Sequence, residues 1–157
     1  MKKDSPDVQL LETFGRLRRA LNLHYTQTVR PLGIGAKQAA LIRLLDKKGT
    51  ASLAELSRWT LTDPAATTRA VTVLLKRGLV RQTEHPTDKR RWQMALSPAG
   101  KKAATQVHRA YGELAQRVAG VLTGSERKTF MEILLKLNGT FSSSRMKDLE
   151  PVDPEQT

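Results

Sequence analysis

Two helix-start signals in the middle of the chain constrain its fold most strongly. Ser52 and Glu55 have the spacing of a capping box, in which each side chain accepts a hydrogen bond from a backbone N–H of the first turn. Asp63 followed by Pro64 is typical of an N-cap and the first residue of a helix. Two short helices separated by only a few residues predict a helix-turn-helix.

A β-hairpin is predicted directly after the second of these helices. Residues 79–84 form its first strand and residues 91–96 its second. The second strand alternates apolar and polar side chains, and this alternation places Trp92 in the core. A helix-turn-helix followed by such a wing is a winged helix-turn-helix, which we expect to span residues 34–96.

Helical segments flank this unit on both sides. Residues 8–30 carry apolar side chains at spacings of three and four, and Ser97-Pro98 opens a further helical segment over 97–145. The two segments either meet across a dimer interface or cap one monomeric core, and the residues alone favour neither. The predicted fold class is mainly α (α+β), a winged helix-turn-helix flanked by N- and C-terminal helices in a single domain over 1–157.

The charge balance points to a polyanionic partner, with an ordinary solvated basic surface as the alternative. The chain has 157 residues, and its 27 Lys and Arg against 15 Asp and Glu give a formal net charge of +12. Residues 147–157 are rich in acidic residues and proline, so we expect a disordered acidic tail there. The basic surplus therefore belongs to the rest of the chain.

Several classes of function are disfavoured by what the sequence lacks. Cysteine is absent, which excludes disulfides, thiolate metal sites and cysteine nucleophiles. His24, His85 and His108 lie far apart without metal-ligand spacing, and no catalytic motif is present. We therefore expect no metal, no cofactor and no enzymatic activity. No apolar run has the length of a signal peptide or a membrane span, so a cytoplasmic protein is expected.

Four segments resemble the MarR (multiple antibiotic resistance regulator) family of bacterial transcription factors. The most specific resembles the family's wing signature of D-x-R, five residues, L-T, two residues and G, and it consists of Asp88-Lys89-Arg90, Leu96-Ser97 and Gly100. The other three are residues 34–44, 53–56 and 74–80. The resemblance implies a homodimer in which segments 8–30 and 97–145 are dimerisation helices, and double-stranded DNA as the partner.

The helix that begins at Pro64 is predicted to enter the major groove by its first turn. The predicted DNA contacts are Ala65, Ala66, Thr67, Thr68 and Arg69. The alanines offer only methyl groups, the threonines add a hydroxyl, and Arg69 can bind guanine or a phosphate. An ordinary surface helix is the alternative. Ser52 could donate a hydrogen bond to a phosphate, although its capping role explains it fully.

The hairpin tip carries Asp88, Lys89, Arg90 and Arg91. The resemblance implies that Arg90 enters the minor groove and that Asp88 orients it through an ion pair. A narrow A·T-rich minor groove attracts arginine because its negative potential is enhanced. A solvated hairpin tip is the alternative, but adjacent cations repel one another unless an anion is near.

The resemblance also implies a pocket for a small aromatic or anionic ligand between the flanking helices and the winged region. The candidate ligand contacts are Arg18, His24, Tyr25 and Arg43. The predicted function is a homodimeric, sequence-specific DNA-binding regulator, a repressor at a pseudo-palindromic operator that such a ligand releases. The alternatives are a non-specific architectural nucleic-acid-binding protein and a winged-helix protein–protein adaptor.

Overall fold

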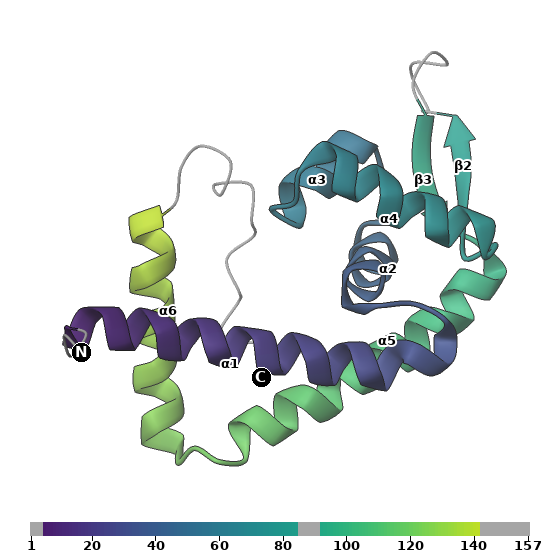
Figure 1. Ribbon diagram of the computed structural model, residues 1–157. Coiled ribbons are helices and arrows are strands. Elements are labelled where there is room, and N and C mark those ends of the chain that lie inside the picture. The colour runs from purple at the N-terminus through teal and green to yellow at the C-terminus, as the bar shows by residue number, and fades with distance from the viewer. Residues whose placement is uncertain (1–4, 85–91, 142–157) are drawn as a thin grey trace.

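A computed structural model describes residues 5–84 and 92–141, and it is mainly helical with one small antiparallel sheet (Figure 1). The predicted fold class is confirmed. The elements are, in order, α1 (Pro6–Val29), the 3-10 turn η1 (Arg30–Leu32), α2 (Ala36–Lys48), β1 (Thr50–Ala51), α3 (Leu53–Trp59), α4 (Pro64–Lys76), β2 (Val80–Glu84), β3 (Trp92–Leu96), α5 (Pro98–Ala119) and α6 (Gly124–Phe141). The predicted tail over 147–157 and the tip of the predicted hairpin lie outside the described residues.

The helix-turn-helix forms as its start signals predict. The Ser52 side chain accepts a hydrogen bond from the Glu55 N–H at 3.2 Å, and Glu55 accepts one from the Ser52 N–H at 2.7 Å. Asp63 accepts from the Ala66 N–H at 2.8 Å at the start of α4. Leu61, in the turn between α3 and α4, has a left-handed backbone with φ 49°. This conformation is unfavourable for a leucine and favours glycine.

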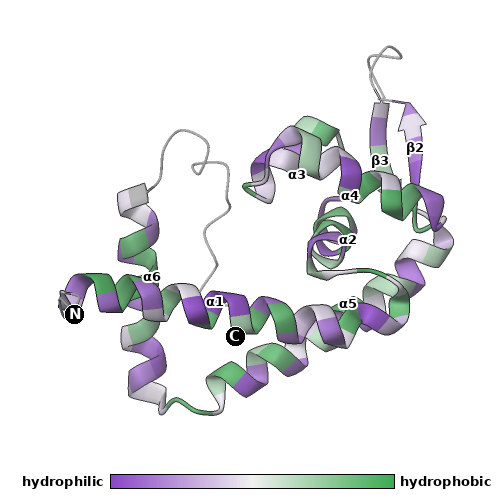
Figure 2. Ribbon diagram, viewed as in Figure 1, coloured by the Kyte–Doolittle hydropathy of each residue, from purple (hydrophilic) through white to green (hydrophobic). Residues whose placement is uncertain are grey.

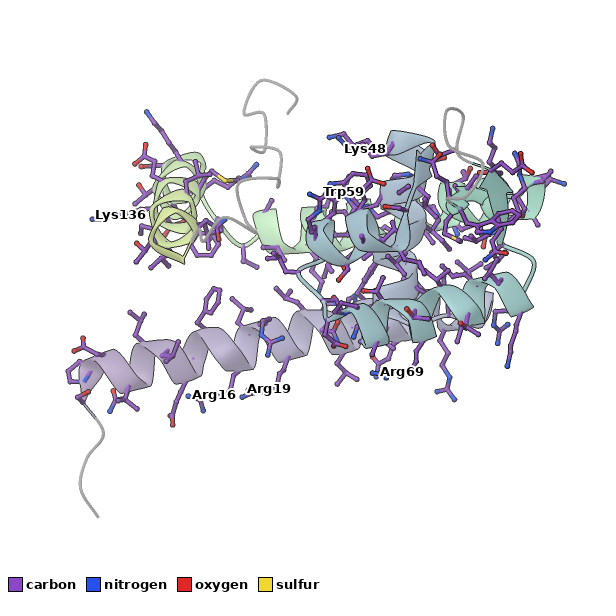
Figure 3. The ribbon with its side chains drawn as sticks, turned by 90° about the horizontal axis from the view of Figure 1, so that it is seen from above. Arg16, Arg19, Lys48, Trp59, Arg69 and Lys136 are labelled. Atoms are coloured by element: carbon purple, nitrogen blue, oxygen red, sulfur yellow. The ribbon has the colours of Figure 1, made fainter. Side chains whose placement is uncertain are left out.

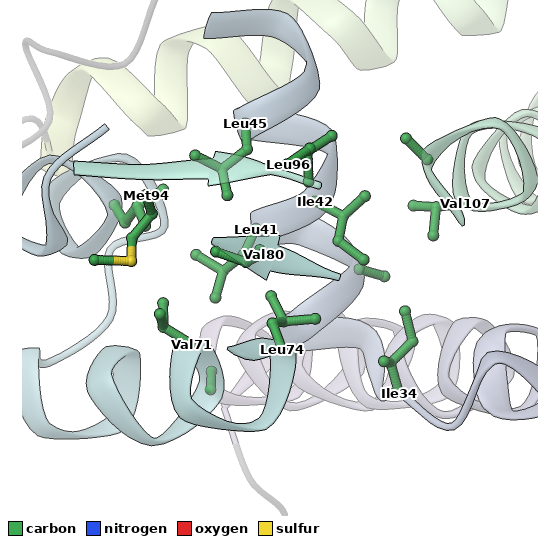
Figure 4. Packing of buried hydrophobic residues seen from close by; sticks show 14 of the residues in the cluster. Ile34, Leu41, Ile42, Leu45, Val71, Leu74, Val80, Met94, Leu96 and Val107 are labelled. Atoms are coloured by element: carbon green, nitrogen blue, oxygen red, sulfur yellow. The ribbon is translucent and has the colours of Figure 1, made fainter. Parts of the chain in front are cut away.

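α2 lies at the centre of the hydrophobic core (Figure 4). Leu41, Ile42 and Leu45 on this helix are at most 1% exposed. Side chains from α4, the sheet and α5 surround them, among them Val71, Leu74, Val80, Met94, Leu96 and Val107. The sheet, with strand order β1-β3-β2, closes one side of this core, and α5 contacts both α2 and α1. The winged unit is therefore complete within one chain.

Burial along β3 does not alternate: Met94, Ala95 and Leu96 at its inner end are all buried, and Trp92 at its outer end is exposed. Val80 pairs with Leu96 and Glu84 with Trp92 in the antiparallel ladder of β2 and β3. Met94 and Leu96 are buried as predicted, but Trp92 is 55% exposed, so the prediction of Trp92 in the core is wrong. Trp92 is the first residue of β3 and lies past the end of the hydrophobic core. No core side chain covers it there, so its ring is exposed to solvent.

The first turn of α5 is fixed against the end of α4. The Ser97 hydroxyl caps α5 by accepting from the Gly100 N–H at 2.9 Å and donates to the Gly78 carbonyl at 2.6 Å. A side chain on Gly100 would overlap the Leu79 carbonyl oxygen. The serine and glycine of the wing signature thus hold the hairpin and α5 together.

The outer parts of α1 and α6 leave apolar surface uncovered in the single chain (Figures 1 and 2). Only Tyr25 and Val29 of α1 are buried, both near its C-terminal end. The exposed large hydrophobic residues of these two helices are Val8, Leu10, Leu11, Phe14, Leu17, Leu23, Met131, Ile133, Leu135 and Leu137. Among the described residues of the single chain, these faces therefore do not cap a core, and dimerisation through them stays a prediction.

Candidate nucleic-acid interface

α4 presents one continuous exposed face. Ala65, Thr68, Arg69, Thr72 and Lys76 are all exposed, at spacings of three and four residues. The opposite face packs on the core through Ala70, Val71 and Leu74. Figure 3 shows Arg69 pointing away from the body of the molecule. The helix therefore offers an unobstructed outer surface that carries methyl groups, hydroxyls and two cations.

Two of the predicted base contacts lie on the wrong face of this helix. Ala66 is 9% exposed and Thr67 is 1% exposed. The Thr67 hydroxyl donates to the Asp63 carbonyl at 3.1 Å, so it is occupied inside the protein. The predictions for Ala66 and Thr67 are wrong because both residues precede Ala70 and Val71 by one helical turn and share their buried face. Thr72 and Lys76 belong to the exposed face and were missed; the same periodicity identifies them.

Ser52 has its hydroxyl committed to the capping box. Its Oγ donates to a Glu55 carboxylate oxygen at 2.7 Å while accepting from the Glu55 N–H. A hydroxyl has a single proton to donate. The structure therefore supports the capping role of Ser52, and a phosphate contact stays a prediction that would require this bond to break.

The base of the wing is described, and its tip is not. Arg81 on β2 is exposed, and Trp92 at the start of β3 is more than half exposed. The predicted contacts Asp88, Lys89, Arg90 and Arg91 lie outside the described residues. The base therefore supplies a further cation and an exposed aromatic ring to the same end of the molecule.

A second polar cluster lies where α1, α2 and α5 meet. The Arg43 guanidinium lies 3.3 Å from the centre of the Tyr111 ring, and the Tyr25 ring meets Tyr111 edge-on with centroids 5.7 Å apart. The Tyr25 hydroxyl and the Arg43 Nε are buried and have no hydrogen-bond partner among the described residues. Burial raises the pKa of the Tyr25 hydroxyl, and the Arg43 charge partly opposes that rise. Buried polar groups without partners are unusual, and a bound ligand would satisfy them.

The structure brings together only two of the four predicted ligand contacts, Tyr25 and Arg43. Arg18 is exposed on α1 and His24 is half-buried. Neither makes a ring, cation–π or side-chain hydrogen-bond contact with the tyrosine–arginine cluster within residues 5–84 and 92–141. Tyr111 completes the cluster and was missed, because nothing in the sequence connects a residue of α5 with residues of α1 and α2.

A cavity of about 420 Å³ adjoins this cluster between α2, α3 and α5. Its lining consists of Ala40, Arg43, Leu44, Asp46, Lys47, Trp59, Thr60 and His108. His108 Nε2 on α5 and Asp46 Oδ2 on α2 lie 2.9 Å apart at its edge. Arg43 therefore belongs both to the cluster and to a cavity that reaches the helix-turn-helix.

Two further observations concern the described residues only. Nowhere in residues 5–84 and 92–141 do three or more His, Asp or Glu side chains gather as they would around a metal ion. None of the helices traced there is both long and apolar enough to cross a bilayer.

Comparison with known proteins agrees with this architecture. Residues 32–91 match the MarR family model. The chain is 26% identical over 107 residues to the uncharacterized HTH-type transcriptional regulator YwhA of Bacillus subtilis (strain 168), covering 68% of this chain and 77% of that one. Over residues 32–91 the chain resembles the MarR family. Its match to the family model includes the whole of the helix-turn-helix and the first strand of the wing.

Solved structures of transcriptional regulators share the fold. A mutant MarR from E. coli in complex with operator DNA has a TM-score of 0.75 at 24% identity, covering 83% of this chain and 94% of that one. The organohalide-sensing regulator RdhR-CbdbA1625 in its 2,4-dichlorophenol-bound form has a TM-score of 0.78 at 16% identity, covering 89% and 83%. Both structures are of transcriptional regulators, and what they share with this chain is the fold.

Proposed function

We propose that this protein is a regulator of the MarR family, homodimeric and sequence-specific, that binds a pseudo-palindromic operator in double-stranded DNA and represses transcription in the bacterial cytoplasm. Residues 34–96 bind the DNA, and the helices over 8–30 and 97–145 form the dimer. The observation that carries the proposal is the exposed face of α4 with Arg69 directed outward. A helix with one buried and one free face fits a major groove.

Charge supports DNA as the partner. The net charge of +12 attracts phosphates, and Arg69, Lys76 and Arg81 are exposed on α4 and β2. A relative of the same fold has been seen on operator DNA. In the proposed complex α4 lies in the major groove, with Ala65, Thr68 and Arg69 facing the bases and the sugar–phosphate edges.

The wing supplies a second contact in this proposal. Arg90 enters an A·T-rich minor groove, Asp88 orients its guanidinium, and Lys89 and Arg91 neutralise phosphates. Such a contact predicts that Arg90→Ala weakens binding most at sites with A·T pairs under the wing. An equal loss on every sequence would make Arg90 a plain phosphate contact.

Self-association is supported by the uncovered faces of α1 and α6. Leu10 is 72% exposed, Phe14 45% and Ile133 49%, although all three are large and apolar. Apolar surface of this extent is unfavourable in water and marks an interface. A second copy satisfies it with two-fold symmetry, which in turn presents two α4 helices to half-sites about ten base pairs apart.

The ligand in this proposal binds at the tyrosine–arginine cluster. Arg43 attracts an anion, the Tyr25 hydroxyl offers a hydrogen bond, and the Tyr111 ring suits a flat aromatic group. A relative of this fold was captured with 2,4-dichlorophenol. A ligand at this junction of α1, α2 and α5 would change the spacing of the two winged units in the dimer and release the DNA.

The decisive experiment is a selection of binding sites from random duplexes, followed by affinity measurements at physiological salt. We expect an enriched sequence with two-fold symmetry and at least a thousandfold preference over random DNA. Enrichment of no sequence, together with a steep salt dependence, would instead support non-specific architectural binding. No retention of DNA at all would support a protein–protein adaptor.

A further inference from the structure

The outer face of α4 has few hydrogen-bond donors to offer to DNA bases. Thr68 is exposed, but its hydroxyl donates to the Pro64 carbonyl at 2.9 Å. Thr72 is exposed, and its hydroxyl donates to the Thr68 carbonyl at 2.8 Å. Because a hydroxyl has only one proton, neither threonine retains a donor for a base while the helix keeps these bonds. Both side chains still carry a methyl group.

Two other residues on the outer face of the first two turns, Ala65 and Arg69, add one methyl group and one charged donor. Ala65 is exposed and has only its methyl group. Arg69 is exposed between the two threonines and is the one charged side chain among residues 64–72 of α4. The outer face of the first two turns thus consists of three methyl-bearing residues around a single strong donor.

The spacing of these residues fits successive base pairs. Ala65, Thr68 and Thr72 follow one another by three and four residues, so they lie in one row along the helix. At 1.5 Å per residue, Ala65 and Thr72 lie about 10 Å apart along the axis. Base pairs are separated by about 3.4 Å, so this row spans about three of them.

We propose that α4 recognises thymine C5-methyl groups at two places, one at Ala65 and Thr68 and one at Thr72, on either side of a guanine bound by Arg69. This inference rests on the proposed function, because it names the bases that the same helix reads. The major groove is where a thymine exposes its methyl group and a guanine its paired acceptors O6 and N7. Contact between methyl groups excludes water without requiring a donor.

Replacement of single thymines by deoxyuridine in the selected operator tests the inference directly. Deoxyuridine lacks only the methyl group and pairs as thymine does. We expect a three- to fivefold loss of affinity at each of the two thymine positions facing α4, as removal of one buried methyl predicts. Thymines outside the α4 footprint should tolerate the replacement. Unchanged affinity at every position would overturn the inference and leave the proposed function intact.

Two variants of Thr72 separate its methyl group from its hydroxyl. Thr72→Ser keeps the hydroxyl and its bond to the helix but removes the methyl, whereas Thr72→Val keeps the methyl and removes the hydroxyl. We expect Thr72→Val to bind within twofold of wild type and Thr72→Ser to bind three- to fivefold more weakly. Thr105→Ser on α5, where an exposed threonine also bonds to its own helix, is the matched control.

Combining the protein and DNA changes makes the test independent of general binding strength. On the duplex with deoxyuridine opposite Thr72, we expect Thr72→Ser and wild type to bind equally, because the methyl pair is already broken. Loss of binding by Thr72→Val with normal binding by Thr72→Ser would show that the hydroxyl is the contact and would overturn the inference. If no specific operator exists, the proposed function itself fails, and the selection detects this before any deoxyuridine is used.

Discussion

The winged unit buries most of its apolar side chains, whereas the two arms, α1 before Tyr25 and α6, leave many of theirs exposed. Leu41 of α2 is 1% exposed, whereas Leu10 of α1 is 72% exposed. In the winged unit most apolar side chains are buried against one another inside the same chain, and Leu61 and Trp92 are the large ones left exposed among its described residues. Among the described residues, no partner covers the apolar faces of the arms. The winged unit is therefore expected to govern the stability of the monomer, and the arms its association.

The largest expected effect is the loss of a central core side chain. Leu41→Ala removes a buried side chain from the middle of α2 and should lower the free energy of unfolding by about 2–5 kcal/mol. Urea denaturation measures this change. Leu10→Ala, studied at a concentration at which the chain is monomeric, should stay within about 0.5 kcal/mol of wild type. Equal effects of the two variants on the monomer would abolish the contrast between the two regions.

A smaller loss is expected from Gly100→Ala at the start of α5. The new methyl group would overlap the Leu79 carbonyl oxygen, so the helix must move away from the hairpin. Overpacking of this kind costs about 1–3 kcal/mol. Gly112→Ala is the matched control in the same helix, because nothing lies within 4 Å of its new methyl group. That control should stabilise the protein by about 0.5–1 kcal/mol, and destabilisation by both variants would indicate that α5 packs differently from the arrangement described.

In the arms, a charged substitution should weaken dimerisation, whereas truncation of an apolar side chain should leave the stability of the monomer nearly unchanged. Leu10→Asp places a carboxylate on the uncovered face of α1 in both copies of a dimer, and we expect dimer dissociation to become at least tenfold more favourable. Sedimentation equilibrium measures the dissociation constant. Leu61→Asp is the control, because Leu61 is also an exposed leucine, at 51%, but lies on the winged unit. If both variants dissociate the protein alike, or if wild type is a monomer, the arms are not the interface.

Much of the winged unit could be predicted from the sequence, because its signals are local. Caps at Ser52, Asp63 and Ser97 each act within their own first turn and begin the helices where expected. The buried face of α4 could also have been predicted, since Ala66 and Thr67 precede Ala70 and Val71 by one turn. Overlooking that periodicity, rather than a lack of signal, produced the two incorrect DNA contacts.

Other features depend on distances that no local pattern contains. Whether Trp92 is buried depends on how far the core extends under β3, and the core ends before it. The contact between Tyr111 and Arg43 joins α5 to α2 across the fold. Exposure of the α1 and α6 faces is decided by the angles at which these helices leave the winged unit. These features follow from tertiary packing alone.

The smallest expected effect concerns Tyr25, which lies where the arm of α1 joins the core. Its pKa is raised by burial, so the folded protein holds the phenolic proton more tightly than the unfolded chain does. The stability that this provides is fully present below the ordinary tyrosine pKa of 10.0 and is lost as the pH rises through the higher value in the folded protein.

Tyr25→Phe removes a buried hydroxyl without a described partner, so at pH 7 it should change the free energy of unfolding by less than about 1 kcal/mol. Above pH 10 it should be more stable than wild type, as denaturation at pH 7 and pH 10.5 would show. Tyr111→Phe serves as the comparison, because Tyr111 is 42% exposed. An unchanged pH dependence in Tyr25→Phe would mean that the junction of arm and core is open to water, and that the two regions are less sharply divided than their exposures indicate.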